Sequence, residues 1–168
     1  MITLPTTIAP RSVKAALLDF GVIVRPSSGA PAQRYGRLGT RWSMEFELPP
    51  MAGDMARVVK ARLAQARLSA LRMPVPLLDG PQGSPGAPVV DGTDSAGTTL
   101  KLRGLTAGWF AREGYWLNVT DSAGNLYLHS VAAPLRAGTD GKATLTLIEP
   151  LRCLLADGAV VRLANPAI

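Results

Sequence analysis

The chain has 168 residues, of which 47% are hydrophobic and 18% are charged, and its formal net charge is +6. This length suits one domain or two small ones, and the hydrophobic content is enough to bury a core. A single cysteine excludes a disulfide scaffold. The chain has only one histidine and one cysteine, too few ligands for a zinc site built from those two residue types.

No targeting or membrane segment is predicted. The first ten residues contain Pro5 and Pro10 and lack the basic start and apolar centre of a signal peptide. The apolar stretches are far shorter than the roughly 20 residues that span a bilayer. We therefore expect a soluble protein in which the one cysteine, Cys153, is reduced.

Strand signals occupy the first part of the chain. Residues 12–24 are rich in strand formers and break at Gly21, which predicts two short strands or one strand with a bulge. Residues 42–48 alternate between apolar and polar side chains, which predicts a half-buried strand. The apolar positions of this strand are Trp42, Met44, Phe46 and Leu48.

Between these strands, residues 25–41 are rich in glycine and proline and carry no acidic side chain. A segment of this composition buries little surface, and long loops of this kind are usually functional or mobile. The segment predicts an arm that extends onto a neighbouring molecule and becomes ordered there. Its arginines are Arg25, Arg34, Arg37 and Arg41, and its one aromatic residue is Tyr35.

One long helix is predicted over about residues 51–72. It follows Pro49 and Pro50, and apolar residues recur in it at spacings of three and four, as on one face of an amphipathic helix. Pro74 and Pro76 end it. The residues of the expected apolar face are Met51, Met55, Val58, Val59, Leu63, Ala66 and Ala70.

The second half of the chain is predicted to be all-β after a break. Residues 77–95 are again rich in glycine and proline, which predicts a linker or a second arm in which Val89 and Val90 make one short strand contact. Turn sequences such as Asp-Gly then separate the expected strands. These strands are residues 98–103, 115–120, 126–131, 143–148 and 159–163.

The predicted fold class is therefore mainly β: a small β-sandwich or barrel with one long α-helix and two long Gly/Pro-rich arms or loops. The predicted divisions are residues 1–76, residues 77–95 as a linker or excursion, and residues 96–168. A single integrated domain is the alternative.

Few residues could carry chemistry. His129 lies in an expected strand, where a hydrogen-bonded structural histidine is the commoner arrangement, and Cys153 is typical of a small buried hydrophobe. Glu45 and Glu47 fit the solvated face of a strand, and residues 80–86 lack the lysine of a phosphate-binding loop. We expect no catalytic, cofactor-binding or metal-binding residue, no small-molecule substrate and no enzymatic activity. An enzyme that depends on the one histidine is the third-ranked alternative.

Positive charge is concentrated in the N-terminal part. Residues 1–76 contain 11 Lys and Arg against 4 Asp and Glu, a net of +7, whereas residues 77–168 contain 7 against 8, a net of −1. This asymmetry fits complementarity between unlike surfaces of identical subunits. It also fits nucleic-acid binding, so a basic nucleic-acid-binding β-barrel is the alternative function. Residues 25–41 lack the aromatic array with which single-strand binders stack bases, so specific nucleic-acid binding is not our first expectation.

Four motifs occur in order and cover most of the chain. They are a Trp-led strand ending in Leu-Pro-Pro-Met (41–51), a Gly/Pro-rich stretch with Pro-Val-Val-Asp-Gly (78–97), a Gly-Trp-Phe to Gly-Tyr-Trp segment (107–117), and Ala-Thr-Leu-Thr-Leu-Ile-Glu-Pro-Leu-Arg followed by Asp-Gly-Ala-Val-Val and a closing Asn-Pro (143–166). In these motifs the chain resembles minor tail proteins of long-tailed bacteriophages and related prophages, among them distal tail proteins. One departure is His129, where such proteins often have glutamine or a similar polar residue.

The resemblance implies a structural protein of the virion, located at the tail tip or baseplate and assembled in the bacterial host cytoplasm. It implies a homo-oligomeric ring, with a hexamer or trimer favoured, whose other partners are phage tail proteins and which does not bind a membrane. Residues 25–41 and 77–95 are then expected between subunits. The candidate intersubunit contacts are Arg25, Arg34, Tyr35, Arg37, Arg41, Val89 and Val90.

Overall fold

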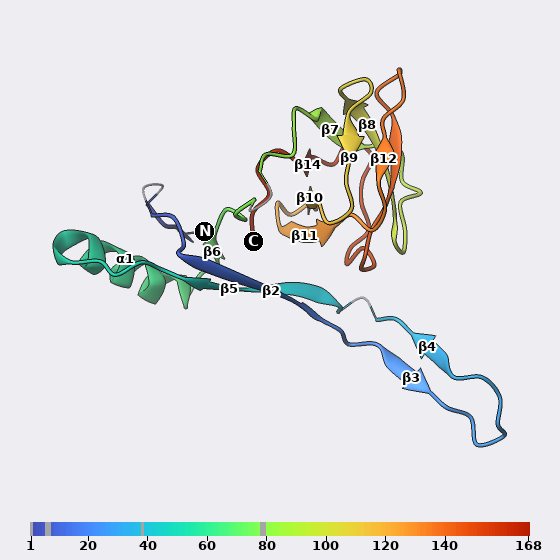
Figure 1. Ribbon diagram of the computed structural model, residues 1–168, viewed down its shortest axis with the longest axis horizontal. Coiled ribbons are helices and arrows are strands. Elements are labelled where there is room, and N and C mark those ends of the chain that lie inside the picture. The colour runs from blue at the N-terminus through green and yellow to red at the C-terminus, as the bar shows by residue number, and fades with distance from the viewer. Residues whose placement is uncertain (1, 6–7, 38, 78–79) are drawn as a thin grey trace.

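The computed structural model describes residues 2–5, 8–37, 39–77 and 80–168. Figure 1 shows a β body and a long two-stranded ribbon that runs past it. One helix, α1, lies near the β2/β5 end of the ribbon, and the turn beyond β3 and β4 forms the tip at the other end. The mainly β fold with one helix agrees with the prediction.

The β body is a barrel made from two three-stranded sheets, β13-β8-β7 and β11-β10-β14. One isolated bridge joins Val89 to Val160 and another joins Val131 to Leu147, so the strands form a closed cycle. Closure leaves no long sheet edge exposed on this body. The strands are β7 (Gly86–Val90), β8 (Thr99–Leu105), β10 (Trp116–Thr120), β11 (Leu126–Ser130), β13 (Ala143–Thr146) and β14 (Val161–Arg162).

Alternating side chains fill the barrel. Along β8, Leu100 and Leu102 point inward and are at most 1% exposed, whereas the intervening Lys101 points outward. Fully burying one such leucine contributes about 1.5–3 kcal/mol. The period-two pattern that predicted these strands is therefore the pattern that builds the core. Other core side chains include Val90, Leu117, Val119, Leu145, Leu147 and Leu163.

The prediction of a linker or arm over residues 77–95 is wrong for residues 86–90, because they form the barrel strand β7, whereas the predicted strand contact of Val89 and Val90 is confirmed. β7 pairs with β8 and has a register shift between Gly86 and Val89, which accommodates Pro88 within a strand. The shift brings Gly86 and Gly104 together. A Cβ on Gly86 would lie 2.8 Å from the Gly104 carbonyl oxygen, and a Cβ on Gly104 would lie 2.7 Å from the Ala87 carbonyl oxygen. A Gly/Pro-rich strand with a bulge has the composition of a loop, which is why sequence patterns misplaced it.

Two small sheets complete the body. β9 (Phe110–Ala111) pairs with β12 (Leu135–Arg136). β1 (Ile2–Thr3) runs parallel to β6 (Leu71–Arg72), and Met73 exchanges backbone hydrogen bonds of 2.7 and 2.8 Å with Ile168. The segment after the helix is thus held to both the first strand and the last residues of the barrel (Figure 1).

The helix is shorter than predicted. α1 spans Gly53–Ala66. Of the predicted continuation, residues 67–70 form a turn and residues 71–72 form β6, because Leu71 pairs with Ile2. Only Val59 is buried, while other members of the expected apolar face stay 39–41% exposed. These exposed residues are Met55, Val58 and Leu63. No helix within the described ranges is long and apolar enough to span a membrane.

The ribbon consists of two successive antiparallel pairs. Its proximal half pairs β2 (Ser12–Leu18) with β5 (Arg41–Glu47), and its distal half pairs β3 (Val22–Val24) with β4 (Gln33–Tyr35). The two strands predicted within residues 12–24 and the strand predicted at 42–48 are confirmed. The predicted loop-like arm over residues 25–41 is corrected, because β4 within it pairs with β3.

An ion-pair cluster ties β8 to the turn before β14. Arg103 contacts Asp157 and Asp91, and the Gly92 N–H donates a 2.8 Å hydrogen bond to Asp157. Hydrogen bonds from Arg103 and then from the Gly92 backbone lower the pKa of Asp157 from 3.8 to about 2. The charged carboxylate therefore stabilises the fold above the unfolded-state pKa, and this contribution is lost as the pH falls through about 2.

We expect Asp157→Asn to flatten the acid limb of the stability curve. The unfolding free energy of the unaltered protein should fall between about pH 4 and pH 2 as Asp157 takes up a proton, and the variant should lose less over that interval. Urea unfolding at several pH values measures the difference. Asp54→Asn, at an exposed helix position, is the control for the loss of one negative charge. Equal slopes for the unaltered protein and Asp157→Asn would contradict this assignment.

Candidate assembly surface

The proximal half of the ribbon is amphipathic across both strands. Its inner face carries the cross-strand pairs Val13–Phe46, Ala15–Met44 and Leu17–Trp42, and the apolar members of β5 are half-buried. Its outer face carries polar and charged side chains together with Ala16 and Leu18. These outer pairs are Ser12–Glu47, Lys14–Glu45, Ala16–Ser43 and Leu18–Arg41.

A polar joint connects the two halves of the ribbon. Asp19 accepts hydrogen bonds from the Gly21 N–H at 2.8 Å and from the Thr40 hydroxyl at 3.2 Å, and it forms an ion pair with Arg34. The Gly21 hydrogen bond, and then Arg34, lower the pKa of Asp19. The Arg41 guanidinium lies 5.2 Å from the centre of the Phe20 ring, a cation–π distance. The joint therefore holds the chain between β2 and β3 against the start of β5.

The distal half exposes apolar as well as basic side chains. Val22, Ile23 and Val24 are 40–61% exposed, and Tyr35 is 57% exposed. A pair of strands with both faces open to water is marginally stable without a partner. Five predicted contact residues lie exposed on the ribbon, and Arg34 is the one paired with Asp19. They are Arg25, Arg34, Tyr35, Arg37 and Arg41.

The two predicted contact residues of the barrel differ from one another. Val90 is fully buried in the barrel core, so its side chain is not available to a neighbouring subunit. Val89 is half-buried and forms the bridge that joins β7 to Val160. Both valines therefore lie in the barrel and not in the ribbon, and of the two only Val89 has a side chain that reaches the surface.

The ribbon meets the barrel at Trp42. Its indole N–H donates a 2.8 Å hydrogen bond to Glu149, and its ring packs edge-on against Trp116, with 4.8 Å between ring centres. The other Glu149 oxygen lies 2.8 Å from Nδ1 of His129, an ion-pair distance, although the geometry at Nδ1 is not that of a hydrogen bond. The same oxygen accepts a 3.3 Å hydrogen bond from the Ser130 N–H. His129 is 1% exposed, as suits a structural histidine.

Sequence reasoning missed Glu149, although a signal was present. Leu145, Leu147 and Glu149 alternate along one strand direction, and all three are buried at 0–2% exposure. A carboxylate in phase with core leucines is costly to bury without partners. Such a residue therefore indicates a buried polar contact, and here it joins the barrel to the ribbon.

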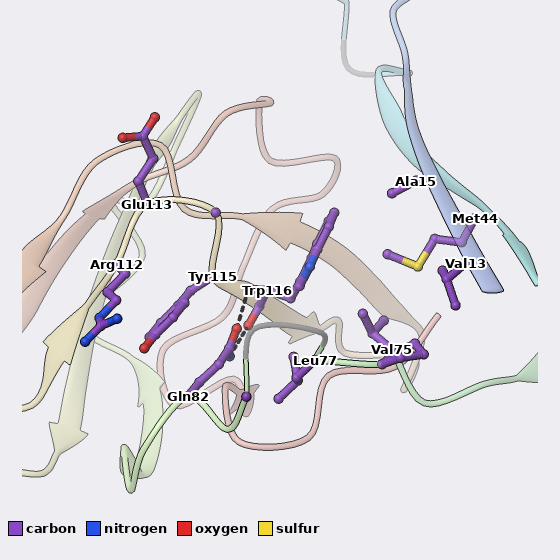
Figure 2. A pocket seen from close by; sticks show the side chains of 13 residues that line it. Val13, Ala15, Met44, Val75, Leu77, Gln82, Arg112, Glu113, Tyr115 and Trp116 are labelled. Carbon is purple, nitrogen blue, oxygen red and sulfur yellow. Dashed lines mark hydrogen bonds between the residues drawn. The ribbon is translucent and has the colours of Figure 1, made fainter. Parts of the chain in front are cut away.

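A cavity of about 310 Å³ separates the remaining inner face of the ribbon from the barrel. Figure 2 shows Val13, Ala15 and Met44 on the ribbon side, facing Gln82 and Trp116 across the space. The barrel side also includes Val75, Leu77, Arg112, Glu113 and Tyr115.

Gln82, which lies within the predicted linker, supports the barrel wall of this cavity. Its amide nitrogen donates a 2.7 Å hydrogen bond to the Trp116 carbonyl and a second bond to the Leu163 carbonyl. Its amide oxygen accepts a 2.6 Å hydrogen bond from the Trp116 N–H. One side chain thus joins the start of β10 to the residue that follows β14.

Among the described residues, no cluster of three or more His, Cys, Asp and Glu side chains has an arrangement that could hold a metal ion. Cys153 is half-buried against the core, and burial raises the pKa of its thiol. No protein-family model matches this chain, and no curated protein matches it either.

Proposed function

We propose that the protein is a structural subunit of a bacteriophage tail tip or baseplate, a distal tail or minor tail protein whose ring joins the tail tube to tip proteins. The observation that carries the proposal is the two-stranded ribbon beside a closed barrel. Within the described part of the chain, neither outer edge of the ribbon pairs with another strand. Unpaired edges are templates for strands of another chain.

A ring of identical copies suits such a ribbon. Its two edges are different surfaces, so copies that join the β2 edge of one ribbon to the β5 edge of the next make head-to-tail contacts, which close into a ring when the rotation between copies allows it. In this proposal the ribbon is the intersubunit arm, and neighbours cover its exposed distal half and the open face of α1. We expect a hexamer or trimer, other tail proteins as further partners, and a place in the virion after assembly in the host cytoplasm.

The ribbon tip is the part to alter. We expect deletion of residues 26–39 to abolish assembly while leaving a folded monomer, because the barrel core uses none of these residues. Analytical ultracentrifugation measures the oligomer, and circular dichroism measures the fold. An unchanged oligomer after the deletion would count heavily against the proposal.

A matched pair of single substitutions makes the test sharper. Ile23, on the ribbon, is 61% exposed, and Val160, on the barrel, is 51% exposed. We expect Ile23→Glu to weaken assembly and Val160→Glu to leave it intact, since only the ribbon residue would enter a strand interface. Equal losses for both variants would show that any added charge disrupts the oligomer and would remove the ribbon from the interface.

One observation favours the alternative of nucleic-acid binding. Four arginines lie on an exposed two-stranded ribbon with Asp19 as the one acidic residue between positions 18 and 41. Basic two-stranded ribbons enter DNA grooves in some proteins. Fluorescence anisotropy with a duplex oligonucleotide at low salt tests this function, which requires affinity that falls steeply as salt is added. A lack of binding at low salt excludes it.

A further inference from the structure

The contact of Trp42 with the barrel lies at the boundary between the attached and the free parts of the ribbon. On one side of Trp42, Val13, Ala15 and Met44 of the ribbon's inner face line the cavity opposite the barrel (Figure 2). On the other side, the distal half extends past the barrel (Figure 1), and Phe20 and Val22 are already 44% and 40% exposed. Trp42 therefore lies where a small rotation would move the whole distal half.

The acceptor of this contact is held firmly. The carboxylate of Glu149 is fully buried, and its two oxygens have different partners. One oxygen accepts from Trp42 of the ribbon, whereas the other lies against His129 and the Ser130 N–H of the barrel. A charge-assisted hydrogen bond in a water-poor site is stronger and more directional than one at the surface. Apolar packing against Trp116 alone would tolerate sliding, but this bond defines one position.

We propose that Trp42 and Glu149 are positioning residues that set the angle between ribbon and barrel, and that loss of their hydrogen bond lets the ribbon swing. The cavity makes this motion feasible, because Val13, Ala15 and Met44 of the inner face border open space on the side of the barrel. The consequence for assembly rests on the proposed function: the orientation of the ribbon would already be fixed before neighbouring copies bind to it. The angle itself is a property of the monomer and does not depend on that function.

Distances between spin labels test the proposal in the full chain. With Cys153 replaced by serine, Lys14→Cys on β2 and Thr144→Cys on β13 place one label on the proximal half of the ribbon and one on the barrel, both at exposed positions. Dilution with unlabelled protein keeps the measured distances within one molecule. We expect a single narrow distance peak for this labelled protein and its loss in Trp42→Phe, which keeps an aromatic ring but removes the N–H.

Trp109→Phe is the matched control. The Trp109 indole N–H also donates to a buried acceptor, the Gln82 carbonyl at 2.9 Å, but both groups belong to the barrel. We expect this variant to lower the stability of the barrel and to keep the narrow peak. A narrow peak in Trp42→Phe, or an equal broadening in both variants, would overturn the proposal.

A variant of the other partner separates the hydrogen bond from ring packing. Glu149→Leu should broaden the distance distribution as Trp42→Phe does, and the double variant should broaden it no further, because both changes remove the same link. Broadening that adds in the double variant would show that each residue acts through separate contacts and would overturn the assignment. If the unaltered protein forms no oligomer, the ring proposal fails. The distance measurements still test the angle between ribbon and barrel, because both labels belong to one molecule.

Discussion

Replacing Gln82 by methionine is expected to lower the free energy of unfolding by about 3 kcal/mol or more. Methionine matches the glutamine side chain in length but cannot bond to the backbone of Trp116 and Leu163. Two carbonyl groups and one N–H would lose their partner, and each buried group left unpaired costs about 1–3 kcal/mol. Urea unfolding, followed by tryptophan fluorescence, measures the loss.

Gln65→Met provides the control for this prediction. Gln65 lies on the exposed side of α1, and the same exchange there should change stability by no more than about 0.5 kcal/mol. We expect the larger loss of stability at Gln82 because its side chain makes hydrogen bonds to the backbone of β10 and of the segment after β14. These bonds take the place of backbone hydrogen bonds between two paired strands. Similar losses at both positions would contradict this role.

The second large effect is expected at the buried pair of His129 and Glu149. His129→Leu leaves the Glu149 carboxylate in the interior without the side chain that lies 2.8 Å from it, and we expect a loss of about 3–5 kcal/mol. Glu149→Leu removes the carboxylate but strands the Trp42 N–H and the imidazole. We expect the double leucine variant to be more stable than the sum of the two single losses predicts, because replacing both partners removes the unpaired groups.

A double-mutant cycle in urea measures this coupling directly. Strictly additive losses would mean that the two side chains act independently, despite their distance. The ribbon provides an internal control, since Lys14 and Glu45 are opposite each other on its exposed face. Their cycle should give a coupling within the range of about 0–1 kcal/mol that exposed ion pairs show.

Strand positions were predictable where the hydrophobic pattern was regular. Residues 42–48 and 98–103 alternate in the sequence, and the corresponding strands β5 and β8 alternate in burial. β14 was predicted at 159–163 and is shorter, while β9 and β12 were missed, because two-residue pairings leave no periodic signal.

The helix and the Gly/Pro-rich segments were harder to predict, because distant partners decide them. Residues 71–72 have helical composition but pair with β1, and β7 is a strand because β8 accommodates its bulge. The predicted arm at 25–41 contains β4, whose three residues pair with β3 across a long turn. Local composition reports neither pairing.

The site was predictable in part. The basic residues of the ribbon are exposed, as an interaction surface requires, and their intersubunit role stays a prediction. Val90 was misplaced, because a valine pair looks the same in an arm and in a core strand. Gln82 and Glu149 were missed as structural residues, because polar side chains are usually expected to be exposed. For Glu149, only its alternation with the buried leucines of the same strand indicates that it points into the core.

By itself the amino-acid sequence determined that this protein is mainly β, that it has one helix, and that its excess of positive charge lies before residue 77. Alternation, helical spacing and composition are local properties, so they can be read without knowing which segments meet. Only the tertiary structure decided that the sheets close into a barrel, that the ribbon stays unpaired along its edges in the described ranges, and that Trp42 reaches Glu149, 107 positions away. These features depend on contacts between distant segments, and such contacts form only when the whole chain has folded.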